Sequence, residues 1–229
     1  MRILVTAGNT QTPIDAVRCL TNIFTGRTGA RIAMEANGRG HAVTLLTSHP
    51  ETVADVPSLE VVAYRTFEAL RTLLAECVPA GGFDAIVHSA AVSDYALAGV
   101  HSGSQAGPSL TLPARKIPST HSELWLRFVP TPKLVDLVRS AWGFRGILVK
   151  FKLEVGIGDE ELIAIGRKSR AHSDADLLVA NTLDGYGREA FLIDRADFAE
   201  RVARSALPAL VLDRIERIFS GTTDRSDVK

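Results

Sequence analysis

The chain has 229 residues, of which 46% are hydrophobic and 23% are charged, and its 26 basic side chains balance 26 acidic ones. This composition suits one globular domain with a sizeable core and excludes a disordered or fibrous chain. A formal net charge of zero gives no overall field that would attract nucleic acid or a membrane surface, so only local basic clusters can bind anions.

The cysteines indicate a reducing compartment, and the apolar runs of the chain predict neither a signal peptide nor a membrane span. Cys19 and Cys77 lack the spacing of metal ligands or of a disulfide framework. The apolar run at the N-terminus is too short for a signal peptide, and no stretch approaches the roughly 20 apolar residues of a membrane span. We expect a cytoplasmic protein with neither a membrane nor a nucleic-acid partner.

The first part of the chain alternates strands and helices. Short apolar runs predict strands at 3–6, 42–47, 59–64 and 83–88. Apolar residues at helical spacing predict helices at 26–38 and 67–77. A strand, a helix and a second strand in succession form a right-handed crossover unit, which indicates parallel pairing.

The second part begins with a segment rich in glycine and proline. Residues 98–120 contain few core candidates, which predicts a long flap. A strand at 124–129 precedes a helix that ends near Ser140, with Thr131 as its N-cap and Pro132 at its first position. Further runs predict strands at 147–151 and 176–180, a short edge strand at 190–194, a helix at 159–171, and a helical tail at 197–219 broken by Pro208.

This order of elements predicts an α/β fold, a Rossmann-like three-layer sandwich with a mostly parallel sheet. We expect a single domain over residues 1–220, including the flap at about 98–120, followed by a polar C-terminal tail at 221–229.

Ligands of a parallel sheet bind outside the carboxyl ends of its strands. After the first strand, Gly8 lets the backbone approach a ligand, and the hydroxyl of Thr10 can donate to a phosphate oxygen. Thr25 or Gly26 can cap the following helix, whose free N–H groups favour an anion. Arg27 in the first turn opposes the helix dipole, which a nearby phosphate would explain.

Two later segments fit a nucleotide. Ala90 and Ala91 follow the strand at 83–88 and leave room for a base or ribose, while Asp94 can accept hydrogen bonds from ribose hydroxyls. Lys116, with Arg115 beside it on the flap and two lysines at the end of the strand at 147–151, suits a triphosphate. A turn, a helix cap or a solvated surface charge would explain each of these residues taken alone.

A nicotinamide site is a weak alternative. The G-x-G-x-x-G fingerprint is absent after the first strand, and Ser48-His49-Pro50 follow the second strand where an acidic residue should hold the ribose.

Taken together, four collinear stretches resemble the phosphopantothenoylcysteine synthetase (phosphopantothenate–cysteine ligase) family. They are TAGNTQTPIDAVRCLTNIFTGRTG, HSAAVSDY, ARKIPST followed by VPTPKLV, and FKLE with the later LLVAN. The resemblance runs from Met1 to about Asp194, and without an attached flavoprotein decarboxylase domain it is closest to the stand-alone ligase. It implies that the carboxylate of 4′-phosphopantothenate attacks the α-phosphate of CTP or ATP, and that the amine of L-cysteine then displaces the nucleoside monophosphate.

The resemblance also implies roles for single residues. Asn22 matches the asparagine that holds the acyl intermediate, and Lys116 matches the flap lysine that meets the triphosphate. Gly8, Thr10, Ala90, Ala91, Asp94, Phe151 and Lys152 fall at nucleotide-binding positions, and Thr25, Gly26, Arg27 and Asn181 join Asn22 on the substrate side.

Further expectations come from relatives in the same family. They form homodimers whose partner subunit helps to close the site, and Mg²⁺ accompanies the triphosphate, held by ligands that the sequence leaves unknown. Lys152-Leu153 stand where several bacterial relatives have two alanines, which leaves the choice between CTP and ATP open. The alternatives are an NAD(P)- or flavin-dependent oxidoreductase and a non-catalytic nucleotide-binding relative.

Overall fold

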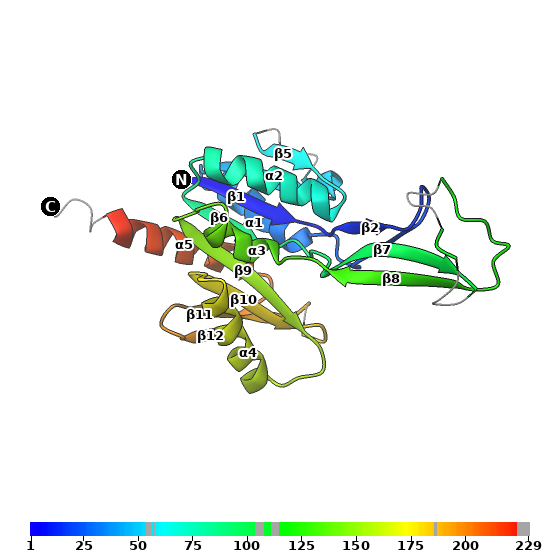
Figure 1. Cartoon of the computed structure of the whole chain (residues 1–229). Helices are drawn as coiled ribbons and strands as arrows, with labels where there is room; N and C mark the ends of the chain where they lie inside the picture. The colour runs from blue at the N-terminus through cyan, green and yellow to red at the C-terminus, as the bar shows by residue number, and fades with distance from the viewer. Residues whose placement is uncertain (54–55, 57, 104–107, 111–114, 186, 224–229) are drawn as a thin grey trace.

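The computed structural model describes residues 1–53, 56, 58–103, 108–110, 115–185 and 187–223. Its centre is an eight-stranded sheet in the order β12-β11-β10-β9-β6-β1-β4-β5 (Figure 1). The strands are β1 (Arg2–Ala7), β4 (Ala42–Thr47), β5 (Glu60–Ala63), β6 (Ala85–His88), β9 (Ile147–Glu154), β10 (Leu177–Thr182), β11 (Glu189–Asp194) and β12 (Ala199–Ala203). The six strands from β10 to β5 are parallel, and β11 and β12 pair antiparallel at one end of the sheet.

Helices cover both faces of this sheet, which confirms the three-layer α/β prediction. The helices α1 (Arg27–Gly38) and α5 (Leu207–Thr223) pack on one face. The other face carries α2 (Phe67–Ala80), α3 (Leu134–Ser140) and α4 (Asp159–His172). A single 3-10 turn, η1 (Pro50–Val53), follows β4.

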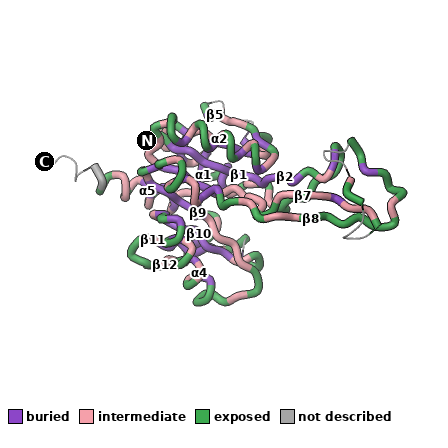
Figure 2. The backbone as a smooth tube through the Cα atoms, viewed as in Figure 1, coloured by how far each residue is buried: buried purple, intermediate pink, exposed green. Residues whose placement is uncertain are grey.

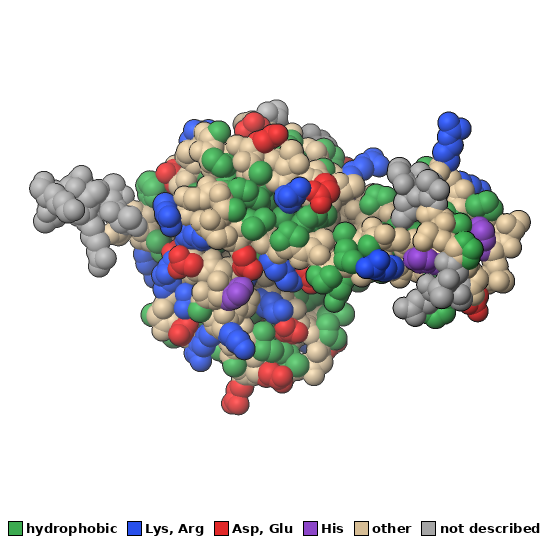
Figure 3. Space-filling view, viewed as in Figure 1, with side chains coloured by type: hydrophobic (Ala, Val, Ile, Leu, Met, Phe, Trp, Pro, Cys, Tyr) green, Lys and Arg blue, Asp and Glu red, His purple; other side chains and the backbone are tan. Residues whose placement is uncertain are grey.

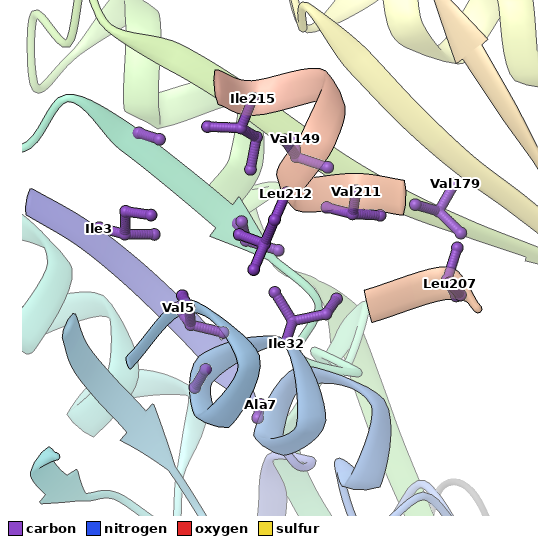
Figure 4. Close-up of a cluster of buried hydrophobic side chains, with 14 of the residues drawn as sticks. Ile3, Val5, Ala7, Ile32, Val149, Val179, Leu207, Val211, Leu212 and Ile215 are labelled. Atoms are coloured by element: carbon purple, nitrogen blue, oxygen red, sulfur yellow. The ribbon is translucent and has the colours of Figure 1, made fainter. Parts of the chain in front are cut away.

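The core divides according to the alternation of side chains along each strand. Ile3 and Val5 of β1 lie under α1 and α5, where Ile32 and Leu212 meet them (Figure 4). Leu4, between Ile3 and Val5, faces the opposite way into the cluster beneath α2 and α3. Burial on both faces explains why the central strands read as continuous apolar runs, and Figure 2 shows the buried backbone concentrated in this body.

Two small antiparallel ribbons extend from the body. One pairs β2 (Gln11–Pro13) with β3 (Cys19–Thr21), and the other pairs β7 (Tyr95–Ser102) with β8 (Leu124–Pro130). The β7–β8 ribbon, called the arm below, projects beyond the carboxyl ends of the central strands (Figure 1). No helix among the described residues is both long and apolar enough to cross a membrane.

The arm corrects the predicted flap. The first part of segment 98–120 belongs to β7, which pairs with β8 across a bulge between Leu97 and Gly99. Residues 104–107 and 111–114 lie outside the described residues. The strand was missed because Val100 is the only fully buried residue of β7, so the segment lacks an apolar alternation.

Three further predictions about elements were wrong. Thr131 does not cap α3, whose N-cap is Lys133; instead its hydroxyl donates to the carbonyl of Ser93 at 2.8 Å. The first part of segment 197–219 is the edge strand β12, so β11 is not at the edge. Pro208 lies in the first turn of α5, where proline is tolerated, and does not break the helix.

The predicted tail at 221–229 is only partly described. The helix α5 continues to Thr223, and residues 224–229 lie outside the described residues.

Candidate active site

A cavity of about 580 Å³ lies at the carboxyl ends of β1, β6, β9 and β10, between the N-termini of α1 and α3. This volume is typical of a small-molecule site, and the position is the one expected for a parallel sheet. Nine of the predicted site residues line it: Gly8, Asn22, Gly26, Ala90, Ala91, Asp94, Phe151, Lys152 and Asn181.

Two glycines bring the loop after β1 against the start of α1. Gly8 and Gly26 have φ angles of 88° and 75°, in the left-handed region that favours glycine. A Cβ atom on Gly26 would lie 2.0 Å from the amide nitrogen of Gly8. No side chain caps α1 at Gly26, so the first N–H groups of the helix are left for water or a ligand at the cavity.

Asn22 is fixed between two loops. Its Nδ2 atom donates to the carbonyl of Ala91 at 3.0 Å, and its own backbone carbonyl accepts a hydrogen bond from Asn9 Nδ2 at 2.7 Å. The side-chain amide therefore sits where the loops after β1 and β6 meet. Because an amide nitrogen carries two hydrogens, the second one and the carbonyl oxygen can serve a ligand.

Thr10 supports the site from behind and does not line the cavity. It is fully buried, and its hydroxyl accepts a hydrogen bond from the backbone N–H of Ser93 at 2.8 Å. This bond fixes the loop that carries Asp94. Asp94 is exposed at the mouth of the cavity, where its carboxylate forms an ion pair with Lys133 at 2.5 Å.

Sequence reasoning underrated a buried cluster on the α3–α4 side of the cavity. Lys150 Nζ donates to Ser173 Oγ at 2.5 Å and to the carbonyl of Ser169 at 3.1 Å. Ser173 in turn donates to the carboxylate of Asp136 at 2.5 Å. Burial lowers the pKa of Lys150, and the negative charge of Asp136 opposes this shift. Lys150 was visible in the sequence as a charge at a strand end, but its partners on α3 and α4 carry no local signal.

His88 is a second buried group on this side. Its Nδ1 atom lies 3.0 Å from the hydroxyl of Thr6, and its side chain lines the cavity. Burial, followed by the positive charge of Lys150, lowers the pKa of His88 to about 4. The imidazole is therefore neutral at physiological pH and contributes polar contacts without a charge.

Four predicted site residues point elsewhere or act from outside. Thr25 and Arg27 line a separate hollow beside α1, while Thr10 has the supporting position described above. Lys116 is exposed, in the segment that connects β7 to β8, and is absent from the cavity lining. Its neighbour Ile117 is buried, and the N–H of Ile117 donates to Asp15 Oδ2 at 3.0 Å. Within a single chain, Lys116 on the predicted flap is therefore not brought into the cavity that Lys150 and Lys152 line.

The cavity holds few metal-binding groups. Asp94 and Asp136 line it, and no cluster of three or more His, Cys, Asp or Glu side chains occurs in the part of the chain that the structure describes. This donor set suits a hydrated cation held mainly by phosphate oxygens better than an all-protein cage.

Arg204 is a cavity residue that the sequence analysis missed. It lies directly after β12, and its guanidinium donates to the hydroxyl of Thr28 in the first turn of α1. The sequence analysis predicted this segment as part of a helix, and that prediction gave no reason to expect a contact between Arg204 and α1.

Comparison with known proteins supplies a family for this geometry. Residues 1–199 match the family described as DNA/pantothenate metabolism flavoprotein C-terminal domain. The coenzyme A biosynthesis bifunctional protein CoaBC of Thermococcus kodakarensis is 34% identical over 227 residues, which cover 95% of this chain and 51% of that protein. The chain therefore spans about half the length of this curated relative.

Solved structures agree on the fold. The DNA/pantothenate metabolism flavoprotein of Streptococcus pneumoniae superposes with a TM-score of 0.80 at 28% identity, covering 95% of this chain and 99% of that one. A Cab2 mutant solved in complex with phosphopantothenate-cysteine has a TM-score of 0.76 at 17% identity, covering 99% and 89% of the two chains. At that identity the likeness supports the shared fold alone.

Proposed function

Because this chain belongs to the DNA/pantothenate metabolism flavoprotein C-terminal domain family, we propose that it is a phosphopantothenate–cysteine ligase of coenzyme A biosynthesis. The observation that carries the proposal is the position of Asn22. Its amide is held at the meeting point of the loops after β1 and β6, beside the open N-terminus of α1, in a cavity lined by small residues and by the buried Lys150.

The first half-reaction forms an acyl-nucleotidylate. A carboxylate oxygen of 4′-phosphopantothenate bonds to the α-phosphorus of the nucleotide, and the bond from that phosphorus to pyrophosphate breaks. Lys150 and Lys152 offset the phosphate charge from the α3–α4 side. Phe151 lies beside the base, and the small side chains of Ala90 and Ala91 leave room for the ribose, with Asp94 within reach of its hydroxyls.

The second half-reaction forms the amide. The amine of L-cysteine bonds to the acyl carbon, the bond from that carbon to the phosphate oxygen breaks, and the nucleoside monophosphate leaves. The Asn22 amide donates to the acyl oxygen as negative charge develops on it. Removal of one such donor typically costs roughly 3 kcal/mol of transition-state stabilisation.

Mg²⁺ fits this site as a companion of the triphosphate. It would be held mainly by phosphate oxygens, with Asp94 and Asp136 as the carboxylates lining the cavity, and would supply charge neutralisation at the α-phosphate. CTP and ATP remain the two candidate nucleotides, and a cytoplasmic location remains a prediction.

A homodimer would explain the position of Lys116. The arm carries exposed apolar side chains, since Tyr95 is 54% and Trp125 is 46% exposed. Figure 3 shows hydrophobic side chains on the surface of the part that projects from the body. Such side chains suit burial against a second copy. If the partner subunit helps to close the site, as in relatives, Lys116 of one subunit can reach a triphosphate bound in the cavity of the other subunit.

The test is a pyrophosphate-release assay with CTP or ATP, 4′-phosphopantothenate and L-cysteine. Wild type should release pyrophosphate with at least one nucleotide. Asn22→Ala should cut turnover about 100-fold with nucleotidylate retained on the protein. Lys116→Ala should lower the rate sharply, while Lys168→Ala, which removes an exposed charge from α4, should not.

Two outcomes would contradict the proposal. Nucleotide binding without pyrophosphate release, when both acceptors are present, would indicate a non-catalytic relative. Tight binding of NADPH or FMN in place of CTP and ATP would indicate an oxidoreductase. Near-normal turnover of Lys116→Ala would remove Lys116 alone from the mechanism.

A further inference from the structure

Resting on the proposed function, we propose that Ser173 and Asp136 are positioning residues, which fix the buried ammonium group of Lys150 so that it meets the phosphates of the nucleotide. The hydrogen-bonded side chains of Lys150, Ser173 and Asp136 are called the lysine clamp below. Ser173 and Asp136 act through Lys150 and need no contact with the nucleotide themselves.

Lys150 is a buried cation on a flexible stem. Leu148, two residues earlier on β9, packs beneath α2 and α3, so the alternation of side chains sends Lys150 to that face of the sheet. The residue is 7% exposed and lines the cavity. A lysine side chain has many rotamers, so an ammonium group without partners would be spread over several positions. A fixed position therefore depends on what the ammonium group contacts.

The end of α4 supplies two acceptors for this ammonium group. Lys150 Nζ donates to the carbonyl of Ser169 at 3.1 Å and to the hydroxyl of Ser173, the C-cap of α4, at 2.5 Å. The last carbonyls of a helix lack intrahelical partners, and a helix C-terminus bears a partial negative charge that stabilises a cation. An ammonium group carries three hydrogens. With two of them donated to described residues, the third can serve a ligand in the cavity.

Asp136 determines which way the Ser173 hydroxyl points. This hydroxyl donates its single hydrogen to the Asp136 carboxylate at 2.5 Å, so its lone pairs are left for Lys150. Ser173 is buried, which makes water a poor competitor for this hydrogen bond. The other carboxylate oxygen lies 3.3 Å from Nε2 of His172. Asp136 thus orients Lys150 through Ser173, and its negative charge opposes the cost of burying the ammonium group.

Ser173 also keeps the cation and the carboxylate apart. Lys133 and Lys152 line the same cavity, and each forms a direct ion pair with a carboxylate. Lys150 forms no direct ion pair among the residues that the structure describes, since the Ser173 hydroxyl stands between it and Asp136. Coulomb attraction weakens with distance, so a lysine separated from its carboxylate keeps more of its charge for an incoming phosphate.

The neighbouring strand adds no competing charge. His88 on β6 is the register partner of Lys150 on β9 and lines the same cavity. Its imidazole is neutral at physiological pH, so it does not repel the ammonium group. A charged hydrogen-bond donor gains most from an ionised acceptor, so the clamp favours a phosphate oxygen over the uncharged parts of a nucleotide.

The experiment measures the affinity for CTP, ATP and their nucleosides, cytidine and adenosine, by titration calorimetry. Wild type should bind at least one triphosphate more tightly than its nucleoside. Lys150→Met should weaken binding of that triphosphate about 10- to 100-fold and change binding of its nucleoside less than about 2-fold. Ser173→Ala and Asp136→Ala should each weaken triphosphate binding about 3- to 10-fold.

Two comparisons separate positioning from a merely structural role. When Lys150→Met is already present, Ser173→Ala should weaken triphosphate binding by less than about 2-fold more, because residues that act through one cation are not additive. Ser173→Thr keeps the hydroxyl, and Asp136→Asn keeps the oxygen that accepts from Ser173. Each of these conservative variants should recover part of the affinity that the alanine variant loses.

Ser140→Ala is the matched control. Ser140 lies on α3, and its hydroxyl donates to the backbone carbonyl of Asp136 at 2.7 Å and not to the carboxylate. It should leave the affinities for triphosphate and nucleoside unchanged. Thermal melts establish that each variant is folded. Lys150→Gln and Ser173→Gly replace Lys150→Met and Ser173→Ala if either of these fails to fold.

Each other result overturns the clamp. A wild type that binds neither triphosphate more tightly than its nucleoside, or an unchanged affinity in Lys150→Met, would remove this cation from nucleotide binding. Additive losses in the double variant would show that Ser173 does not act through Lys150, and equal losses for triphosphate and nucleoside would show a structural effect. If the nucleotide affinities change as expected but wild type releases no pyrophosphate, the ligase proposal fails and the clamp stands.

Discussion

Replacing Gly26 by alanine should damage both stability and activity, because two separate costs meet at this residue. The φ angle of 75° puts alanine in the left-handed region, which costs about 1–2 kcal/mol. The new Cβ would also lie 2.0 Å from Gly8 N and 2.6 Å from Gly8 Cα. These are backbone atoms, so the loop after β1 and the start of α1 must separate, which adds the 1–3 kcal/mol typical of overpacking.

The sum is about 2–5 kcal/mol. For a domain of this size each kcal/mol lowers the Tm by about 2–4 °C, so a loss of 3 kcal/mol corresponds to about 6–12 °C. Gly40→Ala is the matched control. Gly40 has a φ angle of 83° at the end of the same helix, and nothing lies within 4 Å of the Cβ position. It should show only the conformational cost, about 1–2 kcal/mol.

Thermal and urea unfolding measure the two variants, and pyrophosphate release measures turnover. We expect Gly26→Ala to lose most activity, because the separation of the loops displaces Asn22 and the helix N-terminus. Gly40→Ala, at the far end of α1, should retain activity. The reasoning is falsified if the two variants lose the same stability, since the close approach of Gly26 to Gly8 would then carry no energy.

Three other perturbations follow from the contacts. The pKa of His88 is about 4 in the folded protein against an ordinary 6.5, so between these values the unfolded chain binds one more proton than the folded protein. The free energy of unfolding should therefore fall by about 1.4 kcal/mol for each unit that the pH is lowered from 6.5 to 4. Urea unfolding at pH 7, 6 and 5 should show this slope, and His88→Gln should flatten it. Asp15→Ala removes the carboxylate that accepts a hydrogen bond from the Ile117 N–H, so it should increase the rate of proteolysis near residues 115–121. Cleavage at the wild-type rate would show that this hydrogen bond does not anchor the segment. Tyr64→Phe removes the 2.6 Å hydrogen bond from the buried hydroxyl to the carbonyl of Ala7, so it should lower the free energy of unfolding in urea by about 1 kcal/mol. An unchanged free energy of unfolding would mean that water replaces the hydroxyl.

The sequence by itself determined the parallel α/β body and much of the cavity lining. The strands β1, β4, β6, β9 and β10 are buried on both faces, so their composition alone identifies them. Once the strands are parallel, their carboxyl ends share one edge of the sheet. Residues at or just after these ends, such as Gly8, Ala90 and Asn181, must then meet there.

Only the tertiary structure decided the features that depend on distant partners. Each of the strands β7 and β12 has a single fully buried residue, Val100 and Val202 respectively, so no local period marks them as strands. Arg204 reaches Thr28 across 176 positions of the chain, and Lys150 meets Ser173 and Asp136 through the packing of two helices. A local pattern reports which face of one element is buried, whereas these contacts arise from how separate elements are placed against one another.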